Sequence, residues 1–199
     1  MYDFYKNTAG DYVEGYLSTK EKFNGIVFLL REPNDSNPGI FWFRNYIYDR
    51  AIYKESDTEK DKGRSKIAAK KFRNRFEEML KFIGRSKEEL YDAVYCNVHP
   101  ERGENKQSED YRKIMGQKSV EMFNALAKKH KELTVFTCRD IYANIRNYYI
   151  SKGVLKQDDN DGLQYKKGTL NRFKVETEGC TIMVYEMFHP SYSGKVIKE

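Results

Sequence analysis

Polar side chains that could act together occur in three short segments, each placed at or just after the end of an apolar run. Residues 31–35 (Arg-Glu-Pro-Asn-Asp) follow the run 26–30, and the other two segments are 97–100 (Asn-Val-His-Pro) and 189–191 (His-Pro-Ser). They offer a carboxylate that can orient water, an amide that can read hydrogen-bond donors and acceptors, and a histidine that can stabilise an anion. No nucleophile elbow, Walker loop or dinucleotide fingerprint is present. This set suits hydrolysis of an N-glycosidic bond, in which a base flipped out of a nucleic acid leaves as an anion.

An aromatic run follows the first of these segments. Phe41, Trp42 and Phe43 come after Asn37-Pro38-Gly39, so one of them could stack on a planar ligand. The structural alternative is an ordinary turn that leads into a buried aromatic helix. Likewise, His99 and His189, each placed before a proline, could simply cap turns.

The surrounding pattern predicts the elements that would position these groups. The unbroken apolar run 26–30 is typical of a central strand that is buried on both faces, and 93–98 and 133–138 have the same character. Apolar positions at helical spacing predict helices over 65–83, 109–130 and 139–152. The order favours the α/β class, as a three-layer α/β/α sandwich with a central, mostly parallel four-stranded sheet. Right-handed crossovers would then bring the carboxyl ends of the strands to one edge.

Several local features complete this prediction. Ser86 and Glu89 form a capping box for a short helix, and residues 172–177 and 181–188 suit a hairpin around Glu178-Gly179. The charged segment 54–64 and the polar segment 154–171 are expected to be loops.

Composition restricts the class of protein. The chain has 199 residues, of which 36 are Lys or Arg and 30 are Asp or Glu, and we expect a single domain over 1–199. The net charge of +6 and the basic face of helix 65–83 suit either a polyanionic partner or a solvated surface. Without an apolar run long enough to cross a membrane, or a secretion signal, we expect a cytoplasmic protein with no membrane partner. The basic face comprises Lys66, Lys70, Lys71, Arg73 and Arg75.

The three segments resemble the motifs of the uracil-DNA glycosylase superfamily. In that family a first strand leads into an acid-Pro turn, a second strand ends in Asn, and a last strand ends in His-Pro-Ser. Residues 95–103 (YCNVHPERG) are similar to a strand and arginine-bearing loop of its thermostable and bacterial branches, and 135–139 (VFTCR) to its third strand. The resemblance spans residues 25–194 and implies a DNA-repair enzyme that acts on single- or double-stranded DNA as a monomer.

The resemblance also assigns roles position by position. Glu32 would be the water-activating acid, Asn97 would read the edge of the base, and His189 would stabilise the departing base. Further contacts to the substrate would come from Arg31, Asn34, His99, Ser191 and one of the aromatic residues Phe41, Trp42 and Phe43. Because Cys96, Cys138 and Cys180 are the only cysteines, the iron–sulfur cluster of related branches cannot be built, and we expect no cofactor and no metal.

Two other interpretations fit the same residues. The unusual pair Arg31-Glu32 favours a non-catalytic or differently specific member of the same fold, which binds nucleic acid or a nucleobase. Alternatively, the chain is an unrelated α/β protein whose basic character is incidental. The glycosylase interpretation requires the three segments to lie within one pocket, whereas the unrelated α/β protein does not.

Overall fold

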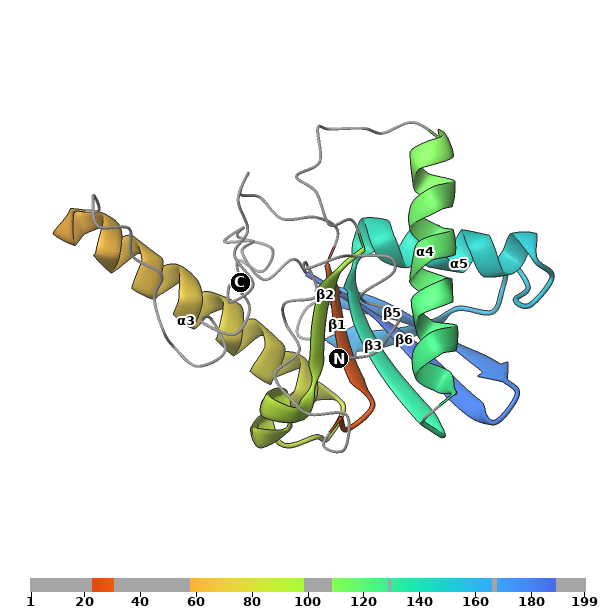
Figure 1. Ribbon diagram of the computed structural model, residues 1–199, viewed down its shortest axis with the longest axis horizontal. Coiled ribbons are helices and arrows are strands. Elements are labelled where there is room, and N and C mark those ends of the chain that lie inside the picture. Colours follow the sequence, from red (N-terminus) through yellow and green to blue (C-terminus); the bar gives the residue numbers. More distant parts are fainter. Residues whose placement is uncertain (1–22, 31–57, 99–108, 129, 166–167, 189–199) are drawn as a thin grey trace.

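The computed structural model describes residues 23–30, 58–98, 109–128, 130–165 and 168–188, and these residues form a mixed six-stranded sheet with helices (Figure 1). The strands lie in the order β2-β1-β3-β6-β5-β4. Neighbours among β2, β1, β3 and β6 are parallel, whereas β5 and β4 are added as antiparallel strands. The strands are β1 (Ile26–Leu30), β2 (Val94–Asn97), β3 (Glu132–Cys138), β4 (Asp161–Tyr165), β5 (Gly168–Thr177) and β6 (Cys180–Met187).

The α/β class is confirmed, but the predicted four-stranded, mostly parallel sheet is wrong. The six-stranded sheet includes β4, which lies inside the segment 154–171 that was expected to be a loop. β4 has the sequence DGLQY and pairs with the first half of β5 at the end of the sheet. A strand at the end of a sheet needs few apolar residues, so its sequence carries little strand signal.

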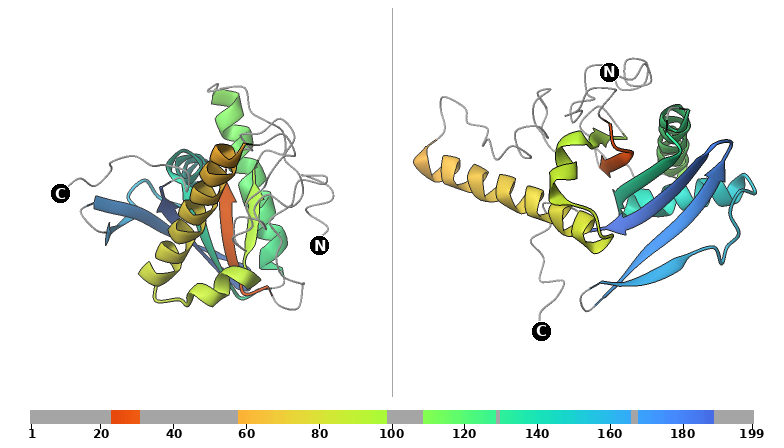
Figure 2. Two further views of the ribbon diagram at one scale, coloured as in Figure 1. Left: turned by 90° about the vertical axis from the view of Figure 1, so that its left-hand side faces the viewer. Right: turned by 90° about the horizontal axis from the view of Figure 1, so that it is seen from below.

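Helices cover both faces of the sheet (Figure 2). On one face, α3 and the 3₁₀ helix η2 bury their apolar side chains against Phe28, Tyr95 and Phe136. On the other face, α4 and α5 pack against Leu29, Val135 and further strand residues. The helices are α3 (Glu59–Phe82), η2 (Lys87–Asp92), α4 (Glu109–Ala127) and α5 (Arg139–Ser151).

β1 lies between two parallel neighbours and all five of its residues are buried, as its unbroken apolar run predicts. Phe28 anchors the α3 face of the sheet. Its ring stacks on Tyr95 and Phe136 with centroid distances of 5.1 Å in both cases, and lies 4.3 Å from the ring of Phe76 on α3. This aromatic cluster joins β2, β1, β3 and α3 into one core.

Two local predictions were wrong. The segment 54–64 was expected to be a loop, but α3 begins at Glu59, because its charged residues are good helix formers. In addition, the apolar positions that predict helices 65–83 and 109–130 include Ile67 and Ile114, which have 58% and 47% of their surface exposed. The helix stripes are therefore narrower than the apolar pattern indicated.

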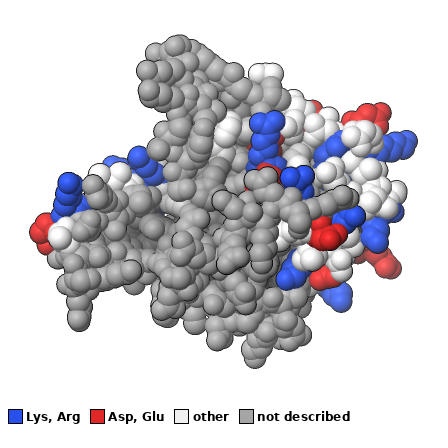
Figure 3. Space-filling model, turned by 90° about the horizontal axis from the view of Figure 1, so that it is seen from above, with Lys and Arg blue, Asp and Glu red and all other residues white. Residues whose placement is uncertain are grey.

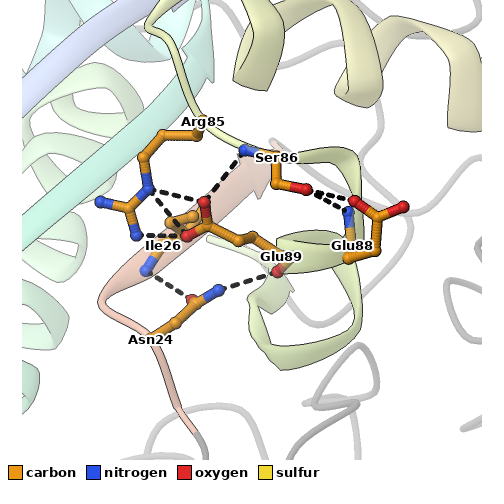
Figure 4. A network of polar contacts seen from close by, with 6 residues as sticks. All are labelled: Asn24, Ile26, Arg85, Ser86, Glu88 and Glu89. Atoms are coloured by element: carbon orange, nitrogen blue, oxygen red, sulfur yellow. Dashed lines mark hydrogen bonds and ion pairs between the residues drawn. The ribbon is translucent and has the colours of Figure 1, made fainter.

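A polar network fixes the amino ends of the strands (Figure 4). The predicted capping box is present, since Ser86 accepts from the first turn of η2 and its backbone N–H donates to Glu89 at 3.0 Å. Glu89 also pairs with Arg85, and this contact lowers the pKa of the Glu89 carboxyl. Asn24 ties the network to β1 by donating to the Glu89 carbonyl at 2.8 Å and accepting from the Ile26 N–H at 3.1 Å.

Candidate functional site

The four parallel strands end in register at one edge of the sheet, which we call the carboxyl edge. Leu30 at the end of β1 pairs with Asn97 at the end of β2, and Cys138 at the end of β3 pairs with Met187 at the end of β6. Three strand spacings separate β2 from β6, a distance of about 14 Å. Segments that follow these strands therefore start within the width of one ligand pocket of each other.

The connections between these strands place a topological switch point at the carboxyl edge. From β1, the chain passes over the α3 face to β2 on one side; from β2 it returns over the opposite face, through α4, to β3 on the other side of β1. The helices that follow β1 and β3 consequently lie on opposite faces. In open α/β sheets, ligands bind outside the carboxyl ends of the strands at such a point.

Most of the predicted site residues lie outside the described residues: Glu32 and His189, together with Arg31, Asn34, Phe41, Trp42, Phe43, His99 and Ser191. Asn97 is described through its backbone as the last residue of β2, at the carboxyl edge. Arg31 follows the last residue of β1, and His189 follows β6 by two residues. The strands therefore bring together the points from which the three segments depart.

A buried carboxylate lies at this edge that the sequence analysis did not select. Glu186, the penultimate residue of β6, is 6% exposed, and it is the only charged side chain in the core formed by the described residues. It accepts hydrogen bonds from Asn171 on β5, through the backbone N–H at 3.3 Å and through the side-chain amide. Arg139, the first residue of α5, places its Nε 3.6 Å from the carboxylate. The available signal was a lone acid inside an apolar strand sequence, VYEMF.

Further hydrogen bonds extend from Glu186 to α5. The Asn160 amide donates to Asn171 Oδ1 at 3.1 Å, and the Tyr142 hydroxyl donates to Asn160 Oδ1 at 2.6 Å. We call this set of five residues (Arg139, Tyr142, Asn160, Asn171 and Glu186) the Glu186 network.

The direction of every bond in this chain follows from the chemistry of its two ends. An ionised carboxylate can only accept, so the Asn171 amide nitrogen must face Glu186 and its oxygen must face Asn160. Burial raises the pKa of the Tyr142 phenol, so that this group remains a protonated donor. All three donors thus point toward Glu186, and hydrogen bonds aligned in this way reinforce one another.

An unused hydroxyl lies beside the buried carboxylate. Thr137 on β3 is directly opposite Glu186 in the β3–β6 register and is fully buried. Within the described part of the chain, its Oγ1 has no hydrogen-bond partner. A buried hydroxyl without a partner is costly, by about 1–3 kcal/mol, and in native proteins it often marks a functional position.

Charge on the described surface is mixed. On α3, the predicted basic face is partly neutralised, because Arg73 pairs with Glu77 at 2.8 Å and Arg75 with Glu78 at 3.2 Å. Figure 3 views the molecule from the carboxyl edge and shows Lys and Arg interspersed with Asp and Glu on the side of α4 and α5. Two of the five cations of the predicted basic face are therefore paired with carboxylates of the same helix.

Two further surface hollows lie beside the described helices and strands. One, of about 640 Å³, follows the outer edge of β5 and is lined by Asp158, Asp159 and Glu176 as well as by Arg172 and Lys174. Both of its cations are paired, as Arg172 contacts Asp161 and Lys174 contacts Glu176 at 2.5 Å. The other, of about 440 Å³, lies between α4 and α5.

Searches for a metal centre and for a membrane span gave no candidate among the described residues. Nowhere in these ranges do three or more His, Cys, Asp or Glu side chains converge as metal ligands. None of the helices that the structure describes is long and apolar enough to cross a membrane. Comparison with known proteins gave no match to a family model, a curated protein or a solved structure.

Proposed function

We propose that this protein is a DNA N-glycosylase that hydrolyses the bond between deoxyribose and uracil, or a related damaged base, flipped out of DNA. The observation that supports this best is the switch point at the carboxyl edge. The strands that precede the three polar segments are β1, β2 and β6, and they end there in register. The switch point lies between β1 and β3, with β2 and β6 on either side of this pair, and an α/β sheet binds its ligand at such a point. The proposed partner is DNA, the proposed state is a monomer, and the proposed compartment is the cytoplasm.

In the proposed reaction, Glu32 accepts a proton from water as the water oxygen attacks C1′ of the sugar. The C1′–N bond breaks, its electron pair leaves with the base, and His189 stabilises the resulting anion. Asn97 pairs with the edge of the base, and one aromatic residue from 41–43 stacks on its face. The products are the free base and an abasic site.

Glu186 has a supporting role in this proposal. It is a positioning residue, because it holds Asn171 and Arg139 at the edge three positions before His189 in the sequence. Its buried, hydrogen-bonded carboxylate gives the end of β6 one defined conformation, from which the segment 189–191 departs.

The test is a labelled duplex that contains a single uracil, followed by alkaline cleavage at abasic sites. Wild type should form product, and His189→Ala should reduce the rate about 100- to 1000-fold, the usual cost of removing one group that stabilises a leaving anion. Lys131→Gln, at the opposite end of β3, serves as the control and should retain full activity. Absence of product from wild type on uracil and on other damaged bases, or an unchanged rate for His189→Ala, would overturn the proposal.

A second candidate is a binding protein of the same fold without glycosylase activity. The pair Arg31-Glu32 favours it, because a cation beside the acid would keep that carboxylate ionised but also occupied. In that case wild type would bind DNA or a free nucleobase without forming any abasic product.

A further inference from the structure

The hollow between α4 and α5 has a composition that differs from the rest of the described surface. Its lining carries three cationic side chains and no carboxylate. The remaining groups are amides and hydroxyls, which can donate hydrogen bonds to an anion. We call it the α4–α5 groove; it is lined by Arg112, Lys113 and Gln117 of α4 and by Asn144, Asn147, Tyr148, Ser151 and Lys152 of and after α5.

Close packing of the two helices forms this groove. A side chain at Gly116 would place its Cβ 2.6 Å from the Asn144 carbonyl oxygen, so only glycine allows this approach. Beside this contact, Gln117 of α4 and Tyr148 of α5 are among the residues that line a hollow of about 440 Å³. That volume lies within the range of about 300–1,000 Å³ found for small-ligand sites.

The charge of Lys152 is available to a ligand in the groove. Lys152 Nζ lies 5.4 Å from the Tyr148 ring centroid, a contact that holds the ammonium over an aromatic face without neutralising its charge. The Tyr148 carbonyl, at the end of α5, already accepts from Ser151 Oγ at 2.7 Å and from the Lys152 N–H at 3.1 Å. The helix carbonyls therefore compete little for the ammonium group.

Arg112 and Lys113 occupy the opposite kind of helix end. They lie one turn from the start of α4, where the helix dipole is positive and disfavours cations. A bound anion would interact favourably with both cations and with the dipole.

The position of the groove relates it to the carboxyl edge. α4 is entered from the end of β2 and α5 begins where β3 ends, and in Figure 1 the two helices cross within the first half of α4. Residues 112–117 lie about 5–12 Å along α4 from its first residue. A polymer that enters the carboxyl edge could therefore continue over this groove.

We propose that the α4–α5 groove binds backbone phosphate groups of a nucleic-acid strand, outside the site at the carboxyl edge. Only the choice of partner rests on the proposed function; the phosphate chemistry rests on the groove itself. Guanidinium and ammonium groups supply the charge, and the Asn144, Asn147 and Gln117 amides supply neutral donors. Backbone contacts of this kind carry no sequence information, so the groove would bind damaged and undamaged strands equally.

The test measures affinity for an undamaged, fluorescein-labelled single strand over a range of salt concentrations. Each lost phosphate contact should reduce the slope of log K against log salt by about 0.7 for a single strand. For Arg112→Gln with Lys152→Gln we thus expect a slope lower by about 1.4 and weaker binding at low salt, independent of base sequence. The matched control, Lys87→Gln with Lys131→Gln, removes the same charge at the amino end of the sheet and should retain the wild-type slope.

Three results would overturn this inference. In the first, the groove variant binds the strand with the same affinity and the same salt slope as wild type. In the second, the control loses as much affinity and slope as the groove variant, which would show an effect of net charge alone. The third is calorimetric binding of pyrophosphate by wild type without binding of the strand, which would make the groove a site for free anions. Because the strand contains no damaged base, a groove effect together with no abasic product would retain this inference and reject the glycosylase.

Discussion

Replacing Glu186 by glutamine separates a functional carboxylate from a merely structural one. Glutamine has the same shape and keeps one oxygen that can accept from Asn171, while it removes the cost of a buried charge. Arg139 compensates that charge only weakly, because its side chain is 89% exposed and its Nε lies 3.6 Å away. We therefore expect Glu186→Gln to change the free energy of unfolding by less than about 1 kcal/mol, in either direction.

Glu186→Leu is the matched comparison. Leucine fills the site but accepts no hydrogen bond, so the Asn171 backbone N–H and amide lose their acceptor at a cost of about 1–3 kcal/mol. For a chain of this length that corresponds to a fall in Tm of roughly 2–12 °C. Urea unfolding would measure both variants, and the uracil duplex would measure the rate of base release.

The proposed role requires that Glu186→Gln slow base release by about tenfold or more while it unfolds like wild type, because glutamine no longer holds Arg139 by its charge. A glutamine variant that is less stable than the leucine variant would refute the energetic reasoning. A glutamine variant with wild-type stability and wild-type activity would refute the positioning role.

Three further predictions concern other parts of the described chain. Gly25→Ala should lower the free energy of unfolding by about 2–5 kcal/mol, because Gly25 has φ +82° and a Cβ there would lie 2.7 Å from a backbone oxygen. Gly84 has a similar φ of +77° but open space around it, so Gly84→Ala should cost only about 1–2 kcal/mol. The difference between the two variants in thermal unfolding measures the clash. The contact with Arg85 lowers the pKa of Glu89 below the usual 4.5, so the stability it contributes is present above pH 4.5 and is lost as pH falls through the pKa of the folded state. The difference in the free energy of unfolding between wild type and Glu89→Gln should therefore shrink from pH 6 to pH 3, and a constant difference would contradict this. Burial raises the pKa of the Cys138 thiol, so iodoacetamide should modify this thiol far more slowly in the native protein than in the urea-unfolded protein. Mass spectrometry measures both rates, and equal rates would contradict the burial.

The buried parallel strands were predictable from sequence because burial on both faces leaves an unbroken apolar run. The predicted runs 26–30, 93–98 and 133–138 contain β1, β2 (Val94–Asn97) and most of β3, and the hairpin around Glu178-Gly179 has the expected turn, with Gly179 at φ +82°. In each case the local pattern and the tertiary environment favour the same structure.

Features that depend on tertiary contacts were not predictable in the same way. The strand β4 is short and polar, and only its pairing with β5 makes it a strand. Glu186 was missed for a related reason. Its partner Asn171 is 15 residues away in the sequence, Asn160, which donates to Asn171, is 26 residues away, and nothing local indicates that they meet. The proposed residues Glu32 and His189 stay predictions.

The two features that the sequence analysis missed have one physical explanation. In a sheet of the four parallel strands alone, β6 would be the outermost strand, and the Glu186 carboxylate would extend into solvent. Because β5 pairs with β6, Asn171 lies directly beside Glu186, and because β4 pairs with β5, Asn160 just before β4 contacts Asn171. The antiparallel extension therefore helps to bury an acid at the carboxyl edge, and its Asn171 supplies the neutral donors that contact this acid directly. An edge strand added only for stability would have no need of a carboxylate at this position, so we interpret the extension as part of the site.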